Sequence, residues 1–262
     1  MKTLLLYILL VLFLVCNCEA ADSIWELCNK DSNFTRNSRV SMNIDSLLVT
    51  LVSETPSKGF FTVSSSGQNQ DKVYGLAQCR GDISRTDCSS CVQDAARKIR
   101  ESCPNQSDSR ILYDFCFLRY SKENFVGKLD AGAGLIYYNV ANVTETDPET
   151  FDKVLATLFD RVRAEAVSAG SKGLGKDKTD LTPFVTLYGL VQCTRDLSEL
   201  DCAQCFAIAV RNFMYACHGK KGCRVLYSSC YVRYEFYPFY FPLDSAKAAA
   251  SAGSTHSVQL YP

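Results

Sequence analysis

Residues 74–91 read YGLAQCRGDISRTDCSSC, and residues 188–205 read YGLVQCTRDLSELDCAQC. Both stretches contain the spacing C-x8-C-x2-C, and they lie 114 residues apart. The same offset relates Cys103 to Cys217, Arg110 to Arg224, Cys116 to Cys230 and Arg119-Tyr120 to Arg233-Tyr234. A constant offset without a gap over this length is typical of an internal duplication. We therefore expect two tandem domains with the same fold.

The N-terminal stretch has the features of a secretory signal peptide. Lys2 precedes an unbroken apolar run from Leu4 to Val15, and small residues surround Ala20. This pattern predicts a signal peptide over residues 1–20 that is cleaved after Ala20. The alternative is a membrane anchor, but a helix needs about 20 apolar residues to span a bilayer. We expect the mature chain to be secreted and to contain no membrane span.

Charge and cysteine content narrow the class of protein. The chain has 28 basic and 28 acidic residues, so its formal net charge is zero, which argues against nucleic acid as a partner. Twelve of the 14 cysteines follow Ala20, and an even number in an oxidising compartment predicts six disulfides. The Cys88–Cys91 and Cys202–Cys205 pairs are also compatible with redox chemistry or zinc, but secretion favours structural disulfides and no metal or other cofactor.

Three N-x-[ST] sequons agree with secretion. They begin at Asn33, Asn105 and Asn142, which are candidate N-glycosylation sites.

The spacing of apolar residues along the chain predicts an α+β fold in which each domain packs helices on an antiparallel sheet. Single long strands are expected at residues 110–120 and 224–236, and a flexible charged loop at 170–180. The first domain should cover residues 21–130 and the second 135–242. Residues 243–262 are rich in Ala and Ser, which predicts a flexible tail.

The repeated motif, the preceding Tyr-Gly-Leu and the later R-x5-C-x2-R-Y resemble the plant cysteine-rich domain named after ginkbilobin-2, also called DUF26. Two copies behind a signal peptide are similar to the cysteine-rich repeat secretory proteins. The resemblance implies a sheet of about five strands with two helices in each domain, and residence in the apoplast. It also implies these disulfides: Cys28–Cys103, Cys79–Cys88, Cys91–Cys116, Cys193–Cys202 and Cys205–Cys230. Cys217 and Cys223 remain as the sixth pair.

The founding member of that family is an antifungal lectin that binds mannose through an Asn, an Arg and a Glu. The resemblance carries the first two over to Asn29 and Arg110 in the first domain, where Ser121 replaces the Glu. It carries the last two over to Arg224 and Glu235 in the second domain, which has no matching Asn because it lacks the first cysteine. The alternative is that these arginines are structural. Strict alternation along one strand would also place Arg224 and Glu235 on opposite faces.

Enzyme motifs do not stand out in this sequence. It contains two histidines, His218 and His256, and neither lies in a recognisable catalytic motif. We therefore expect a non-enzymatic binding protein, and the resemblance implies that it acts in plant defence. One hypothesis is a mannose-binding antifungal lectin. The other is a protein-interaction module with an extracellular receptor or cell-wall partner, supported by aromatic residues such as Tyr231 and Tyr237.

Overall fold

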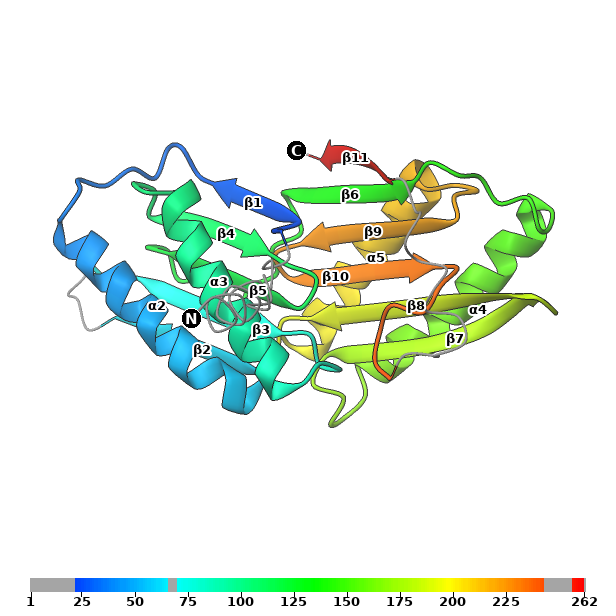
Figure 1. The fold of residues 1–262 in the computed structure, drawn as a ribbon, viewed down its shortest axis with the longest axis horizontal. Coiled ribbons are helices and arrows are strands. Elements are labelled where there is room, and N and C mark those ends of the chain that lie inside the picture. Colours follow the sequence, from blue (N-terminus) through cyan, green and yellow to red (C-terminus); the bar gives the residue numbers. More distant parts are fainter. Residues whose placement is uncertain (1–21, 66–69, 243–255, 262) are drawn as a thin grey trace, which may run out of the picture.

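Two α+β units lie side by side in the computed structural model (Figure 1). The structure describes residues 22–65, 70–242 and 256–261, so the predicted signal peptide lies outside it. The first unit contains β1 (Trp25–Cys28), α2 (Arg39–Lys58), β2 (Phe60–Ser64), β3 (Tyr74–Cys79), α3 (Arg85–Ser102), β4 (Asp108–Leu112) and β5 (Cys116–Ser121). The second contains β6 (Gly134–Asn139), α4 (Pro148–Ala166), β7 (Leu174–Thr182), β8 (Val185–Cys193), α5 (Glu199–Ala216), β9 (Gly222–Tyr227), β10 (Cys230–Glu235) and β11 (His256–Tyr261). The α+β prediction is confirmed.

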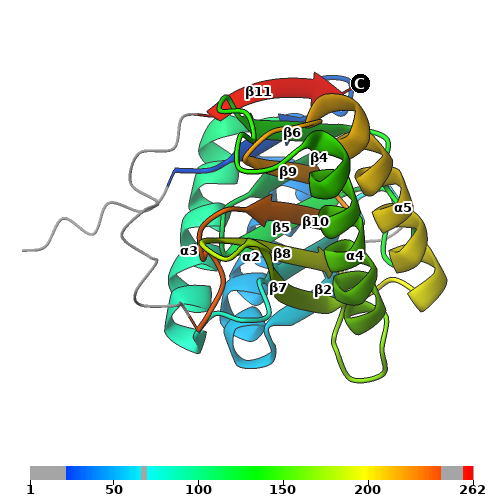
Figure 2. The same ribbon diagram turned by 90° about the vertical axis from the view of Figure 1, so that its right-hand side faces the viewer.

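Both sheets are antiparallel and repeat one strand order. The first is β1-β4-β5-β3-β2, and the second is β11-β6-β9-β10-β8-β7. Apart from β11, each strand of the second sheet has a counterpart in the first. Two helices cover one face of each sheet, and Figure 2 shows the two helix pairs on opposite sides of the molecule. The helix-free faces therefore also point in opposite directions.

The repeated motif joins a strand to the start of a helix. Ser84 caps α3 by accepting a hydrogen bond from the Asp87 N–H, and Ser198 caps α5 in the same way. Cys88 and Cys91 are three residues apart, so both lie on the buried face of α3. One bonds to Cys79 at the end of β3 and the other to Cys116 at the start of β5. The motif therefore holds α3 against two adjacent strands.

The five disulfides that the resemblance implies are present, and so is the sixth, between the two remaining cysteines. The second unit repeats two bridges of the first as Cys193–Cys202 and Cys205–Cys230. The other two pairs are Cys28–Cys103 and Cys217–Cys223. None of these cysteines can serve as a thiol redox pair or as a zinc ligand while it is bonded.

Strand register explains why the last two bridges differ. Cys28 on β1 faces Ser109 on β4, whereas Tyr138 on β6 faces Cys223 on β9. Cys223 lies 114 residues after Ser109, so Tyr138 occupies the position of Cys28. Because β6 carries no cysteine at this position, Cys217 bonds to Cys223 on β9 instead.

The two long strands predicted at 110–120 and 224–236 are hairpins. β4 and β5 pair on either side of a turn at 113–115, and β9 and β10 pair on either side of a turn at 228–229. Neither turn contains Gly or Pro. The first, Tyr113-Asp114-Phe115, is mostly aromatic, so its composition does not separate it from the flanking strands. The second is Ser228-Ser229, and serine is a turn residue that the prediction of one long strand overlooked.

The flexible loop predicted at 170–180 is wrong for most of its length, because β7 begins at Leu174 and pairs with β8. Gly175 lies so close to α4 that an added Cβ would be 1.9 Å from the Val162 carbonyl oxygen. This glycine therefore permits close packing of the helix on the strand and does not indicate a loop.

The predicted flexible tail also needs correction at its end. Backbone pairing places His256–Tyr261 as β11, antiparallel to β6. Residues 243–255 lie outside the described ranges. Alanine and serine content predicted disorder because it cannot anticipate pairing with a strand that lies more than 100 residues earlier in the sequence.

An apolar cluster joins the two units. It contains Trp25, Leu112 and Phe117 from the first unit, and Leu135 and Leu226 from the second, all of them buried. Burial of such side chains contributes about 1.5–3 kcal/mol each relative to exposure. The two units are therefore held together by a shared apolar core as well as by polar contacts.

Candidate functional site

The residues carried over from the lectin motif lie on the helix-free faces of the sheets. In the first unit, Asn29 directly follows β1 and its N–H donates to the Asp108 carbonyl oxygen (3.0 Å). Asp108 faces Ser121 on β5. Asn29, Asp108 and Ser121 therefore form one row across three adjacent strands. We call this the first polar row.

The second unit contains the equivalent row, and its Asn was missed by the sequence comparison. Because Tyr138 faces Cys223, the next residue on β6, Asn139, lies beside Gly222, and Gly222 faces Glu235 on β10. The second polar row is therefore Asn139, Gly222 and Glu235. The expectation that this domain has no matching Asn is wrong.

Local hydrogen bonds support the equivalence of the two asparagines. The Asn29 Oδ1 accepts from the Asp31 N–H (3.1 Å), and the Asn139 Oδ1 accepts from the Ala141 N–H (2.9 Å). The positions are related by an offset of 110, not 114, as subtraction of 29 from 139 shows. A comparison that allowed a gap could have aligned Trp25–Asn29 with Leu135–Asn139, because both segments begin with an apolar residue and end in Asn.

The hairpin brings Arg224 and Glu235 together, although they would point apart on one continuous strand. Arg224 on β9 faces Arg233 on β10, and Glu235 lies two residues further on the same face. The Glu235 Oε1 lies 2.9 Å from the Arg233 Nε and 3.5 Å from the Arg224 Nε. The Glu235 carboxylate occupies space above Gly222, where an added Cβ would be 2.0 Å from the Oε2. Gly222 is therefore required for this arrangement.

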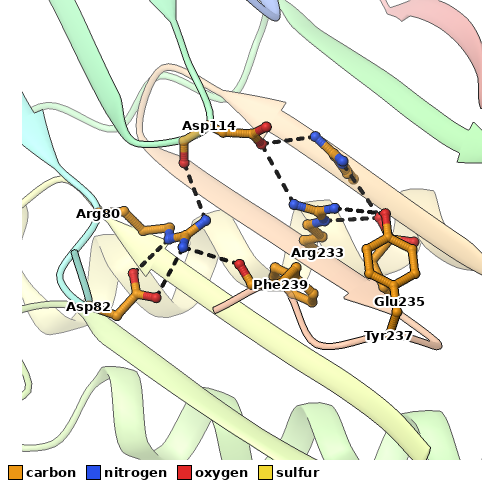
Figure 3. Close-up of polar contacts among 8 residues, drawn as sticks. Arg80, Asp82, Asp114, Arg233, Glu235, Tyr237 and Phe239 are labelled. Carbon is orange, nitrogen blue, oxygen red and sulfur yellow. Dashed lines mark hydrogen bonds and ion pairs between the residues drawn. The ribbon is translucent and has the colours of Figure 1, made fainter. Parts of the chain in front are cut away.

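Asp114, in the β4–β5 turn of the first unit, completes the arginine cluster of the second (Figure 3). Its Oδ1 lies 2.9 Å from the Arg224 Nη1 and 3.6 Å from the Arg233 Nη1. The Arg233 Nη2 donates to the Tyr237 hydroxyl (3.0 Å). The cluster therefore contains two cations and two carboxylates, and one of the carboxylates comes from the other unit.

Burial and the neighbouring groups shift the pKa of Arg233 in opposite directions. Burial lowers the pKa of Arg233, but Tyr231, Glu235 and Asp114 more than offset this and raise its pKa above the ordinary value. Burial and then the Glu235 carboxylate raise the pKa of the Tyr237 hydroxyl. Glu235 is 0% exposed. The guanidinium groups stay charged, and the carboxylate that neutralises them is closed off from solvent.

The first unit uses its equivalent arginines in the same way. Arg110 and Arg119 each place an Nη1 2.8 Å from the Asp130 Oδ2, in the segment that joins the units. Arg110 also donates to the Ser228 hydroxyl in the β9–β10 turn of the second unit. Burial raises the pKa of the Asp130 carboxyl, but Arg110 and Arg119 reverse this and lower it below its usual value.

An acidic side chain is present in both polar rows, but on different strands. Asp108 on β4 takes the position of Gly222, and Ser121 on β5 takes that of Glu235. The Asn29 Nδ2 donates to the Asp108 Oδ2 (3.2 Å). The first unit therefore retains a carboxylate near Asn29 and Arg110, although the sequence position that was compared holds a serine.

The segment after β10 folds back against the first unit, as Figure 3 shows. The Arg80 Nε lies 2.6 Å from the Asp82 Oδ1, and both side chains are buried. The Arg80 Nη2 donates to the Phe239 carbonyl oxygen (3.1 Å), and the Phe241 N–H donates to the Asp82 Oδ2 (2.6 Å). The segment at 237–241, which begins with the interface candidate Tyr237, thus contacts the protein's own first unit.

The remaining candidates lie on the surface. The three sequon asparagines, Asn33, Asn105 and Asn142, are exposed and remain predicted glycosylation sites. The His218 Nδ1 lies 3.6 Å from the Asp152 Oδ2, and the histidine side chain is largely exposed. Within the ranges that the structure describes, no group of three or more His, Cys, Asp or Glu side chains has metal-binding geometry. None of the helices in those ranges is long and apolar enough to cross a membrane.

Comparison with known proteins agrees with the duplicated fold. The family model described as salt stress response/antifungal (Stress-antifung) matches residues 27–123 and 138–237. The chain is 73% identical to cysteine-rich repeat secretory protein 55 of Arabidopsis thaliana over the full length of both. It is 41% identical to an antimicrobial ginkbilobin-2-like protein of Castanea crenata, over 85% of this chain and 90% of that one.

A solved structure shows the same arrangement of two domains. The tandem DUF26 ectodomain of the cysteine-rich receptor-like protein PDLP8 of Arabidopsis thaliana matches with a TM-score of 0.71 and 27% identity, covering 83% of this chain and 99% of that one. Fold, disulfides and both sequence matches lead to one assignment. The chain belongs to the Stress-antifung (DUF26) family of plant secreted cysteine-rich proteins, with two tandem copies of the domain.

Proposed function

We propose that this protein is a secreted, non-enzymatic interaction module of the plant apoplast that acts in defence. The observation that carries this proposal is the use of Arg110 and Arg224 as contacts between the domains. The two domains then present a single rigid surface to a partner. The family description, salt stress response/antifungal, supports a role in defence.

The arrangement of charges around Arg224 disfavours the binding of a free sugar there. Arg224 and Arg233 are mostly buried and already share Asp114 and Glu235. A sugar hydroxyl that displaced one of these carboxylates would leave buried charge short of a partner, which costs about 1–3 kcal/mol or more. Rigid, preformed binding surfaces instead suit macromolecular partners, because less freedom is lost on binding.

Competition binding distinguishes the two hypotheses. The biotinylated mature protein should capture a saturable set of proteins from apoplastic fluid, and unlabelled protein should compete while millimolar mannose should not. The Asp114→Ala variant, which loosens the contact between domains, should capture them less well. Capture that mannose abolishes would reject the proposal in favour of a lectin.

Carbohydrate binding at the second polar row is the second candidate. It is supported by the juxtaposition of Asn139, Arg224 and Glu235, which supply the amide, guanidinium and carboxylate that hold sugar hydroxyls. Because Glu235 is closed off from solvent, side chains around it would have to move to admit a sugar. Tyr237 lies in the same cluster, since its hydroxyl and Glu235 both bind Arg233. Under this candidate, calorimetry should show tighter mannose binding to Tyr237→Ala than to the wild type, and none to Glu235→Gln. Equal absence of heat in all three would reject it.

A further inference from the structure

The outer edge of β6 differs from the other sheet edges. Without β11, β6 would be the edge strand of the second sheet. Its sequence, GLIYYN, has no charge and no proline, and it is rich in residues that favour strands. An edge of this kind presents unpaired N–H and C=O groups and readily accepts another strand.

The other three edges are shorter or charged. β1 has four residues including Glu26, and β2 has five. β7 is long but carries Lys176, Asp177 and Lys178 in succession, and charged edges resist pairing. Among the described strands, β6 therefore combines length with an uncharged edge.

The chain's own C-terminal strand lies on this edge. β11 pairs with β6 at every position from Gly134 to Asn139, in antiparallel register. This register places His256 opposite Asn139, at the end of the second polar row. Thirteen residues, 243–255, lie between Pro242 and His256 in the sequence. Because β11 belongs to the same chain as β6, it is present at a high effective concentration near this edge.

We infer that the edge of β6 is a strand-binding site, with β11 as its resident occupant, that accepts an extended, uncharged peptide segment of a partner protein when β11 is released. Main-chain hydrogen bonds supply the affinity in this mode of recognition, and side chains on alternate positions supply specificity. The inference rests on the proposed interaction function and names a surface for it. Binding at this edge ends beside Asn139, so occupancy of the edge would also affect the second polar row.

A proline pair in the full chain tests this inference. Proline removes a main-chain donor, and two in succession disrupt pairing on whichever side of the strand faces β6. The acceptor is the full mature chain carrying Val258→Pro and Gln259→Pro, and the probe is a fluorescent peptide of residues 255–262. By fluorescence anisotropy, the peptide should bind this variant at least tenfold more tightly than the wild type, whose edge is occupied.

Two controls make the comparison specific. The Ala248→Pro/Ala249→Pro variant carries the same prolines outside β11 and should bind the peptide as weakly as the wild type. A peptide with proline at both 258 and 259 should bind none of the proteins. Equal binding to all proteins, or no binding to the Val258→Pro/Gln259→Pro variant, would overturn the inference. So would a variant that dimerises and excludes the peptide, since the edge would then pair with a second copy.

Hydrogen exchange provides a second readout that does not depend on the peptide label. The amides of residues 134–139 that face β11, every second one along β6, should lose protection in the Val258→Pro/Gln259→Pro variant and regain it when the peptide is added. Unchanged protection would overturn the inference. If no protein were captured from apoplastic fluid but the peptide bound as expected, the proposed function would be rejected and the inference about the β6 edge would stand.

Discussion

Gln78 and Gln192 make the same pair of hydrogen bonds in opposite directions across the domain boundary. The Gln78 Nε2 donates to the Cys193 carbonyl oxygen (2.7 Å), and the Gln192 Nε2 donates to the Cys79 carbonyl oxygen (3.2 Å). Their Oε1 atoms accept from Arg195 N–H (2.9 Å) and Gly81 N–H (3.0 Å), respectively. Each partner is related to its counterpart by the offset of 114, so the two domains meet through matching surfaces, as in a twofold dimer.

Both glutamines are buried, so each truncation should leave main-chain groups of the other domain without a partner. Gln78→Ala and Gln192→Ala should each lower the free energy of unfolding by about 1–3 kcal/mol in urea titrations. Gln93→Ala, on the exposed face of α3, should change it by less than about 0.5 kcal/mol. Loss in only one of the buried variants would contradict the reciprocal contact.

Asp114 joins the arginine cluster to the first domain, so its removal should weaken the domain contact. Asp114→Asn should lower the unfolding free energy by about 1–2 kcal/mol, because Glu235 still neutralises part of the charge. The matched control is Asp94→Asn, whose pair with Arg97 lies on the surface at 3.5 Å and should contribute about 0–1 kcal/mol. Equal effects in thermal melts of the two variants would contradict a structural role for Asp114.

The lowered pKa of Asp130 makes stability depend on pH. Such a carboxyl contributes stability above its ordinary pKa of 3.8, and that contribution is lost as the pH falls through the lower pKa of the folded state. Between these two pKa values, the unfolding free energy of Asp130→Asn should fall less steeply with decreasing pH than that of the wild type. Parallel curves from urea titrations at several pH values would show that the Arg110–Asp130–Arg119 contact does not shift this carboxyl.

The two disulfides that have no counterpart in the other domain should contribute unequally to the free energy of unfolding, because the chain loops that they close differ in length. Cys28 and Cys103 are 75 residues apart, whereas Cys217 and Cys223 are six apart. A disulfide stabilises the fold by reducing the conformational entropy of the unfolded chain, and it does so more when the loop is longer. Replacing each pair by serine should therefore lower the free energy of unfolding by about 4–5 kcal/mol for Cys28–Cys103 and by about 2 kcal/mol for Cys217–Cys223. The Cys79–Cys88 and Cys193–Cys202 pairs, both nine apart, should have equal effects in urea titrations. A larger loss for Cys217–Cys223 would contradict this order.

Gly175→Ala should destabilise the second domain, since the added Cβ would meet the backbone of α4. We expect a loss of about 1–3 kcal/mol by thermal or chemical unfolding. Gly132→Ala is the matched control, because nothing lies within 4 Å of its added Cβ. An unchanged melting curve for Gly175→Ala would show that α4 and β7 are less closely packed than described.

Features determined by local sequence were predictable. The duplicated cysteine motif indicated two domains and a disulfide framework, and the family resemblance supplied the pairing. Serine caps and apolar spacing define α3 and α5 within the motif itself. These features depend on residues that are near one another in the chain.

Features that depend on strand register were not predictable. The position of Asn139 follows from which residue faces Cys223, and a fixed offset could not show the change from 114 to 110. The convergence of Arg224 and Glu235 depends on a turn without Gly or Pro. Arg110 and Arg224 each also have one partner in the other domain, Ser228 and Asp114 respectively. Contacts between residues about 110 positions apart leave no periodic signal in one sequence.

The central claim is that Arg110 and Arg224 hold the two domains together, and hydrogen exchange across the interface tests it most directly. The Tyr113 N–H is bonded in the β4–β5 turn, and the Ser229 N–H is bonded to Asp130. Arg224→Ala should speed exchange at Tyr113 in the first domain, and Arg110→Ala should speed exchange at Ser229 in the β9–β10 turn of the second domain. Faster exchange confined to the domain that carries the substitution would contradict the claim.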